Sequence, residues 1–174
     1  KFGLRVGVST WRRVPDTSLP PRAKASANYL NSMLATRDAR QAGYDEAILL
    51  DQNGYVSEGP GENIFLVKDR VISTPPASSA ILEGITRGTV ITLSRDLGYQ
   101  VVERPISRVE LYTADELFFT GTAVEIQPII EVDGRVVADG QPGEVTKQLY
   151  DMYQRVVRGL EPRYRSWLTP VYNR

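Results

Sequence analysis

The chain contains no cysteine and no histidine among its 174 residues. The absence of cysteine excludes disulfides, thiolate metal sites and cysteine nucleophiles. The absence of histidine excludes a Ser-His-Asp triad and removes the commonest metal ligand and the usual general base. If the protein is an enzyme, its proton transfers therefore depend on lysine, tyrosine, aspartate, glutamate or a cofactor.

An excess of either charge is also missing. Lysine plus arginine and aspartate plus glutamate number 21 each, so the net charge is zero and nothing favours binding to nucleic acid or to an anionic membrane. No apolar run reaches the roughly 18 residues of a transmembrane helix. No signal peptide is visible, so we expect a cytoplasmic protein.

The length is sufficient for one domain with a sizeable core. We find no internal repeat, low-complexity segment or linker that would divide the chain. The first residue is lysine rather than methionine, and residues 4–9 already have the pattern of a strand. We therefore expect the chain to be the later part of a longer protein, with further residues upstream.

Short apolar runs separated by turn residues predict an α+β domain whose sheet is substantially antiparallel. Strands are expected at residues 4–9, 46–51, 55–57, 64–68, 71–74, 99–103, 116–120, 124–130 and 135–137. Helices are expected at residues 22–41, after residues 82–87 as far as Gly98, and at 143–159, with a helical turn at 109–112. Asn53-Gly54 predicts a type I′ hairpin, and hairpins are also expected at Asp69-Arg70 and Asp133-Gly134.

Lys24 is the first candidate for chemistry, because the pattern places it in the first turn of the helix at residues 22–41, just after Pro20-Pro21. Apolar side chains recur on roughly one face of this helix, at Ala23, Ala27, Leu30 and Leu34. The helix dipole disfavours a cation there, so this placement together with partial burial makes the amine more nucleophilic. The alternative is a solvated surface lysine.

A second candidate is the turn at residues 57–63, Ser-Glu-Gly-Pro-Gly-Glu-Asn, which follows a strand. Its two glycines let the backbone approach a ligand closely, and the carboxylate of Glu58 can point inward. The alternative is an ordinary hairpin connection with exposed acids.

Two further segments have the character of anion sites. Residues 83–87 open a helix, so their free backbone N–H groups and the Thr86 hydroxyl can bind a phosphate, although a plain helix cap is the alternative. Residues 120–123, Thr-Gly-Thr-Ala, end a buried strand and can complete a phosphate cradle or bind a carboxylate, although a tight turn is the alternative. A lysine, an acid and two such turns together match what pyridoxal phosphate requires.

These motifs resemble those of the class IV (fold type IV) pyridoxal-phosphate aminotransferases, most of all the branched-chain amino acid aminotransferases. Residues 24–29 resemble the lysine motif, in which Asn-Tyr occupies the fourth and fifth positions after the lysine, and residues 51–65 match the glutamate segment almost throughout. Residues 82–87 and 121–123 match further motifs in the same order, so the resemblance covers essentially the whole chain. Ala27 replaces a common glycine and Val124 a common alanine, and both departures bear on substrate preference.

The resemblance implies a D-amino-acid aminotransferase-like fold, in which residues 1–174 form the large C-terminal domain with a mixed, largely antiparallel pseudo-barrel sheet and flanking helices. A small N-terminal domain would lie upstream. A homodimer or higher homo-oligomer is also implied, because family members build the site with a loop of a neighbouring subunit.

The resemblance also assigns roles. Lys24 would hold pyridoxal 5'-phosphate as a Schiff base and move the proton between substrate and cofactor, while Glu58 would pair with the pyridine nitrogen and stay ionised. Tyr29 would hydrogen-bond the phenolic oxygen, and the backbone amides of Thr122 and Ala123 would receive the substrate carboxylate. The other implied cofactor-binding residues are Leu82 on the ring face, Gly84, Ile85, Thr86, Gly121 and Thr122. No metal is implied.

The implied reaction is the transfer of the amino group of leucine, isoleucine or valine to 2-oxoglutarate. One alternative is a D-amino-acid or (R)-amine aminotransferase, or an aminodeoxychorismate-lyase-like enzyme of the same fold and cofactor. Another, from a different class, is a non-catalytic domain that keeps the fold.

Overall fold

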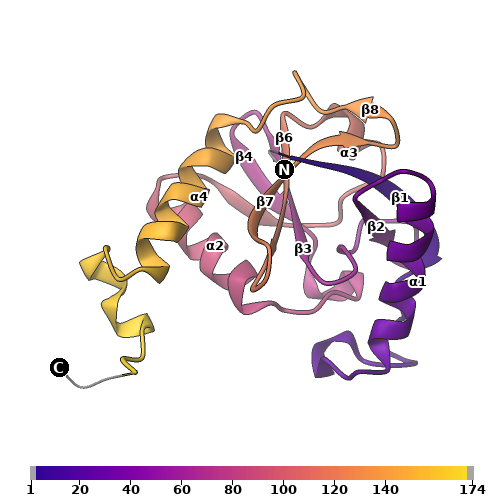
Figure 1. Cartoon of the computed structure of the whole chain (residues 1–174), viewed down its shortest axis with the longest axis horizontal. Helices are drawn as coiled ribbons and strands as arrows, with labels where there is room; N and C mark the ends of the chain where they lie inside the picture. Colours follow the sequence, from indigo (N-terminus) through magenta and orange to yellow (C-terminus); the bar gives the residue numbers. More distant parts are fainter. Residues whose placement is uncertain (1–2, 172–174) are drawn as a thin grey trace.

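A curled sheet forms the centre of the computed structural model, which describes residues 3–171 (Figure 1). The strands are β1 Leu4–Arg12, β2 Glu46–Leu50, β3 Asn63–Lys68, β4 Val71–Thr74, β5 Val101–Glu103, β6 Glu116–Gly121, β7 Glu125–Val132 and β8 Arg135–Val136. Their order is β2-β1-β7-β6-β3-β4-β5, with β8 on β7. The helices are α1 Asn28–Gln41, α2 Ile85–Asp96, α3 Glu110–Thr113 and α4 Glu144–Val157, with 3-10 turns at Pro21–Ala23, Ala77–Ser79 and Pro162–Trp167.

The sheet is mixed, as predicted, and antiparallel at its centre. The pairs β3–β4, β3–β6, β6–β7 and β7–β8 are antiparallel, while β1 runs parallel to β2 and β7, and β4 runs parallel to β5. Parallel neighbours need a long crossover, which α1 supplies between β1 and β2. The expected α+β class is confirmed.

The central strands are buried on both faces. Along β3, Ile64 and Leu66 join one apolar cluster, whereas Phe65 and Val67 join a second cluster that includes residues of α2 and α4. In the second cluster Phe65 stacks on Phe118 of β6, with ring centroids 5.1 Å apart. This double burial explains why the strands have continuous apolar sequences, and it gives the side chains at the strand ends a rigid support.

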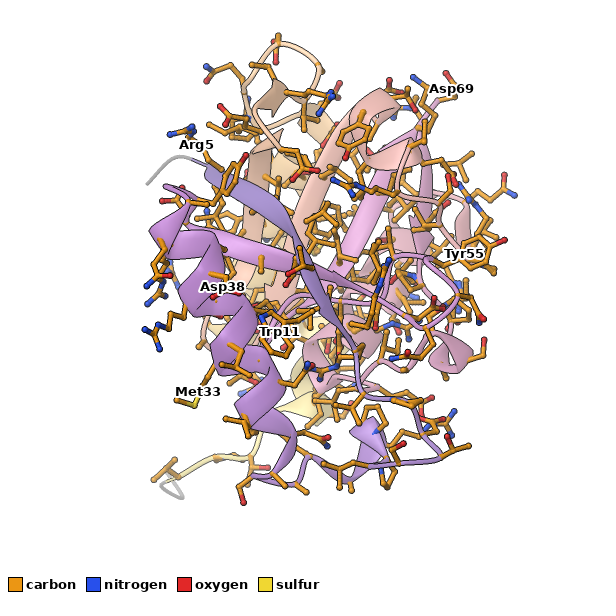
Figure 2. The ribbon with its side chains drawn as sticks, turned by 90° about the vertical axis from the view of Figure 1, so that its right-hand side faces the viewer. Arg5, Trp11, Met33, Asp38, Tyr55 and Asp69 are labelled. Carbon is orange, nitrogen blue, oxygen red and sulfur yellow. The ribbon has the colours of Figure 1, made fainter. Side chains whose placement is uncertain are left out.

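Helix α1 packs at the β1–β2 end of the sheet, whereas α2 and α4 lie toward the other end (Figure 1). Figure 2 shows Trp11, at the end of β1, close to Asp38 of α1, and the Asp38 carboxylate accepts a 2.8 Å hydrogen bond from the indole nitrogen of Trp11. This contact fastens α1 to the end of β1.

Helix α1 begins at Asn28, so the predicted start at residue 22 is wrong. Pro21–Ala23 form a 3-10 turn instead, and Lys24 follows in a left-handed conformation with φ 48° that interrupts a helical path. The predicted apolar face is wrong as well, because Leu30 is 65% exposed. The buried residues of α1 are small or polar, namely Asn28, Ser32, Ala35 and Ala39. Small side chains let the helix lie close to the sheet.

The turn at Asn53-Gly54 also differs from the prediction. Only Gly54 has a positive φ, of 87°, whereas a type I′ turn needs two such residues. The Asp51 carboxylate accepts hydrogen bonds from the backbone N–H groups of Asn53 and Tyr55, and so stabilises a turn of a different type at this position. The expected strand at residues 55–57 makes only isolated bridges. Both other predicted hairpins are confirmed, since β3–β4 and β7–β8 are antiparallel pairs.

The remaining elements agree with the predictions to within a few residues. Helices α2 and α4 are present, and β5 is shorter than expected because it begins at Val101. Within residues 3–171, the helices are too short or too polar to cross a bilayer.

Candidate functional site

Two adjoining pockets between α1 and the start of α2 collect the predicted site residues. The first, lined by α1, the end of β1 and the turn at residues 57–63, contains Lys24, Tyr29, Glu58 and Leu82. The second shares Lys24 and Leu82 with the first, and its other predicted lining residues are Gly84, Ile85, Thr86, Gly121 and Thr122. Ala123 lines neither pocket, although it follows Thr122 directly.

Glu58 is the buried acid of the first pocket, with only 2% of its surface exposed. Arg13 Nη2 lies 2.6 Å from its Oε1, and Asn63 Nδ2 donates a 2.8 Å hydrogen bond to its Oε2. The backbone N–H of Leu82 donates to the same carboxylate at 3.1 Å. Burial raises the pKa of Glu58 to about 7, although the Arg13 charge and the Leu82 N–H act in the opposite direction. The reading of the turn as a connection with exposed acids is therefore wrong for this residue.

The backbone around Glu58 is held in place on both sides. Its carbonyl accepts the N–H of Leu49 in β2 at 2.9 Å, and the Ser57 hydroxyl donates to the Ser79 carbonyl at 2.6 Å. Gly59 permits the tight passage that follows, because a Cβ there would lie 2.8 Å from a carboxylate oxygen of Glu62 and 3.0 Å from the Phe119 ring. The carboxylate of Glu58 thus projects from a rigid turn.

Two residues of this cluster were missed by the sequence reasoning. Arg13, which is 8% exposed, joins Glu58 to α1, because its Nη1 donates to the Ser32 hydroxyl at 3.0 Å. Asn63 joins Glu58 to the next loop, because Nδ2 also donates to the Leu82 carbonyl at 2.7 Å. A buried carboxylate requires a cationic or hydrogen-bonding partner, but the pattern does not tell which arginine supplies it.

Lys24 lies where the two pockets meet, and its side chain is exposed. Among residues 3–171, no group forms a hydrogen bond or ion pair with its amine. The predicted location in a helical first turn is wrong, so the argument for a reactive amine from the dipole of α1 does not apply. Its left-handed backbone, closed by a 3.2 Å bond from its N–H to the Pro21 carbonyl, costs roughly 1 kcal/mol, a kind of strain that clusters at functional sites.

The second pocket is built on the N-terminus of α2. The helix begins at Ile85 without a side-chain cap, and its first helical hydrogen bond runs from the Gly88 N–H to the Gly84 carbonyl. The N–H groups of residues 85–87 therefore have no acceptor within the helix, and this end can bind an anion. The alternative of a side-chain cap is wrong for this helix. A Cβ at Gly84 would lie 2.4 Å from Asn63 Oδ1, so any other residue here would displace the Asn63 side chain.

The turn after β6 closes the second pocket from the other side. A Cβ on Gly121 would lie 3.5 Å from the Gly61 carbonyl oxygen, so this turn runs beside the one that carries Glu58. The hydroxyls of Thr86 and Thr122 make no hydrogen bond to another residue within the described part of the chain.

These residues fit a phosphorylated heteroaromatic ring. Uncapped N–H groups and free hydroxyls suit a phosphate, the buried carboxylate suits a protonated ring nitrogen, and the unpaired amine between them suits an aldehyde.

The sequence matches the family described as amino-transferase class IV over residues 1–132. A probable branched-chain-amino-acid aminotransferase from Aquifex aeolicus is 53% identical over 99% of this chain and 56% of its own length. The branched-chain-amino-acid aminotransferase of Salmonella typhimurium is 47% identical over 97% of this chain and 55% of its own length. The chain thus spans little more than half the length of these relatives.

Solved structures agree with these matches. The branched-chain aminotransferase of Thermoproteus uzoniensis with norvaline has a TM-score of 0.94 and 54% identity, over 98% of this chain and 56% of that one. The Thermobaculum terrenum branched-chain amino acid aminotransferase in its PLP-form has a TM-score of 0.97 and 48% identity, over 99% of this chain and 56% of that one. Like the sequence relatives, both solved chains are therefore considerably longer than this one.

Proposed function

Because the chain belongs to the class IV amino-transferase family, we propose that the full protein transfers the amino group of leucine, isoleucine or valine to 2-oxoglutarate with pyridoxal 5'-phosphate as cofactor. The observation that carries the proposal is the unpaired amine of Lys24 between a buried carboxylate and an uncapped helix start. Branched-chain specificity is supported by the names of the relatives that are 46–53% identical to this chain.

When bound, pyridoxal phosphate supplies an electron-accepting ring for the bond that breaks at the substrate Cα. Lys24 would hold the cofactor covalently until the substrate amine displaces it, and its freed amine would then move the proton from the substrate Cα to the cofactor. Glu58 places a negative charge against the ring nitrogen, and Arg13 opposes the effect of burial on that carboxylate. Tyr29, which lines the first pocket, hydrogen-bonds the phenolic oxygen.

The phosphate and the substrate carboxylate are assigned to the second pocket and its rim. The N–H groups at the start of α2, with the hydroxyls of Thr86 and Thr122, bind the phosphate, while Leu82 covers the ring face. The backbone amides of Thr122 and Ala123 receive the substrate carboxylate, and both residues are exposed.

The direct test is the visible absorbance of the full-length protein with pyridoxal phosphate, before and after L-leucine or D-alanine. We expect L-leucine alone to bleach the band of the bound cofactor, with glutamate formed when 2-oxoglutarate is present. Bleaching by D-alanine instead would move the function to the D-specific relatives. A protein without a cofactor band would be a non-catalytic member of the fold.

A homodimer and a cytoplasmic location are part of the same proposal and rest on the family resemblance. Light scattering after size-exclusion chromatography measures the assembly, and cell fractionation measures the location. A monomer with full activity would remove the need for a neighbouring subunit at the site.

A further inference from the structure

The hydroxyl of Thr120 is a buried polar group without a partner. Thr120 lies in β6 with 1% of its surface exposed, and its Oγ1 has no hydrogen bond within residues 3–171. Three other buried side-chain atoms share this property in the described residues, namely Asn31 Oδ1, Arg87 Nε and Ser94 Oγ. Of the four residues, Thr120 alone lines the second pocket. A buried hydroxyl without a partner is unfavourable, so a hydroxyl of this kind in the lining of a pocket is a candidate contact for a ligand.

The direction of the side chain follows from the strand. Side chains two residues apart lie on the same face, and Phe118 belongs to the cluster that includes residues of α2 and α4. Thr120 is therefore on the face that α2 covers. Its partner across the ladder is Asn63 of β3, which approaches Gly84 at the start of α2. Thr120 thus lines the same pocket as the uncapped start of α2, on the side of the sheet.

The two pockets suit different parts of a phosphorylated ligand. The first pocket contains the Glu58 carboxylate, which suits the ring nitrogen, and Thr120 does not line it. The second contains the α2 start, Thr86, Thr122 and Thr120. A hydroxyl beside free N–H groups can donate a hydrogen bond to an oxygen of a dianionic phosphate, whereas a ring carbon offers no acceptor.

We propose that the Thr120 hydroxyl donates a hydrogen bond to the phosphate group of the bound cofactor and is thus a further binding residue of the site. The inference rests on the proposed function for the identity of the phosphorylated ligand. The start of α2 and Thr86 hold the phosphate from the helix side, and Thr120 and Thr122 hold it from the end of β6.

The experiment compares Thr120→Val, Thr120→Ser and the control Ser94→Ala in the full-length protein. Ser94 is also buried, and its hydroxyl lacks a partner among residues 3–171, but it does not line the second pocket. We expect the apoprotein with Thr120→Val to bind pyridoxal phosphate about tenfold more weakly in an absorbance titration, because one hydrogen bond to a charged group is lost. Thr120→Ser and Ser94→Ala should retain wild-type affinity.

Thermal unfolding of the apoproteins separates a ligand contact from a structural role. Without ligand, Thr120→Val should be as stable as the wild type or more stable, because a buried hydroxyl without a partner has been removed. Wild-type cofactor affinity in Thr120→Val would overturn the proposal. A large loss of apoprotein stability would also overturn it, since the hydroxyl would then serve the fold.

Inorganic phosphate keeps this test independent of the reaction. It should raise the unfolding temperature of the wild-type apoprotein more than that of Thr120→Val, and an equal rise in both would contradict the role of Thr120. If the wild type fails to bind pyridoxal phosphate but shows this difference with inorganic phosphate, the proposed function fails while Thr120 remains a phosphate ligand.

Discussion

Arg13 Nη2 lies 2.6 Å from Glu58 Oε1, and the two side chains are 10% and 3% exposed. The pair ties the end of β1 to the turn that follows β2, and the Ser32 hydroxyl extends the connection to α1. A buried ion pair stabilises little beyond an apolar pair of equal size, but the loss of one partner leaves an uncompensated charge. The value of this pair is that it orients a carboxylate and sets its charge.

Arg13→Met should weaken cofactor binding and activity by about tenfold to a hundredfold. The Arg13 charge is the main influence that lowers the pKa of Glu58 against the effect of burial, so without it the pKa rises further. The measurement is the pH dependence of cofactor absorbance and affinity in the full-length protein, which a purely structural role would leave unshifted. Arg12→Met is the matched control, since the Arg12 side chain is exposed and unpaired within the described residues. An unchanged pH profile in Arg13→Met would refute this positioning role.

Glu58→Gln should change how the stability of the apoprotein depends on pH. The folded protein keeps a proton on Glu58 up to about pH 7, whereas the unfolded chain releases it near the ordinary value of 4.5. The contribution of this group to the free energy of unfolding is therefore greatest below pH 4.5 and declines as the pH rises to 7, by at most about 3 kcal/mol. Urea unfolding of wild type and variant across that range measures the difference. Identical slopes would mean that Glu58 ionises normally in the fold.

Lys24→Ala should lower steady-state transamination by between roughly a hundredfold and ten-thousandfold, because the covalent anchor and the proton carrier are both lost. Added methylamine should restore part of the rate. Lys147→Ala, which removes an exposed lysine of α4, should leave the rate unchanged. Full turnover by Lys24→Ala without an added amine would exclude the assigned role.

Gly84→Ala and Gly88→Ala test the close approach at the start of α2. At position 84 the new Cβ would lie 2.4 Å from Asn63 Oδ1, so Asn63 has to move away from Glu58, and we expect about 1–3 kcal/mol lower stability and weaker cofactor binding. At position 88 a Cβ meets nothing within 4 Å, so the same substitution should stabilise the helix by about 0.5–1 kcal/mol. Chemical denaturation of both variants gives the comparison. Equal effects would show that Asn63 adapts freely.

Local patterns predicted the elements whose formation depends on local chemistry. The hairpins at Asp69-Arg70 and Asp133-Gly134 were correct, and all four turn residues have positive φ. The predicted start of α1 is too early. The left-handed conformation of Lys24 interrupts the helix, and helix propensities, which describe only local preference, do not predict it.

The candidate site was predictable in its motifs but not in its connections. Glu58 and Thr86 belong to motifs with recognisable turn chemistry, and the structure brings both to the adjoining pockets. Arg13 and Asn63 act through contacts made across the fold. Thr120 belongs to the segment 120–123 that the sequence indicates as an anion site, but only the structure shows that its hydroxyl is buried without a partner in the described residues. Such residues become visible only when the packing of distant segments is known.

Strand β1 leaves the ribosome before its partners, yet it lies between β2 and β7, and Leu4 pairs with Ile129. Contacts of such long sequence separation form slowly, so a nascent chain leaves one backbone edge of β1 unpaired until β7 has been synthesised. Arg13 follows directly on β1, and its salt bridge to Glu58 reaches full geometry only when β1 is in place. We therefore expect the protein to acquire its cofactor late in folding, after β1 has paired with β2 and Arg13 has reached Glu58.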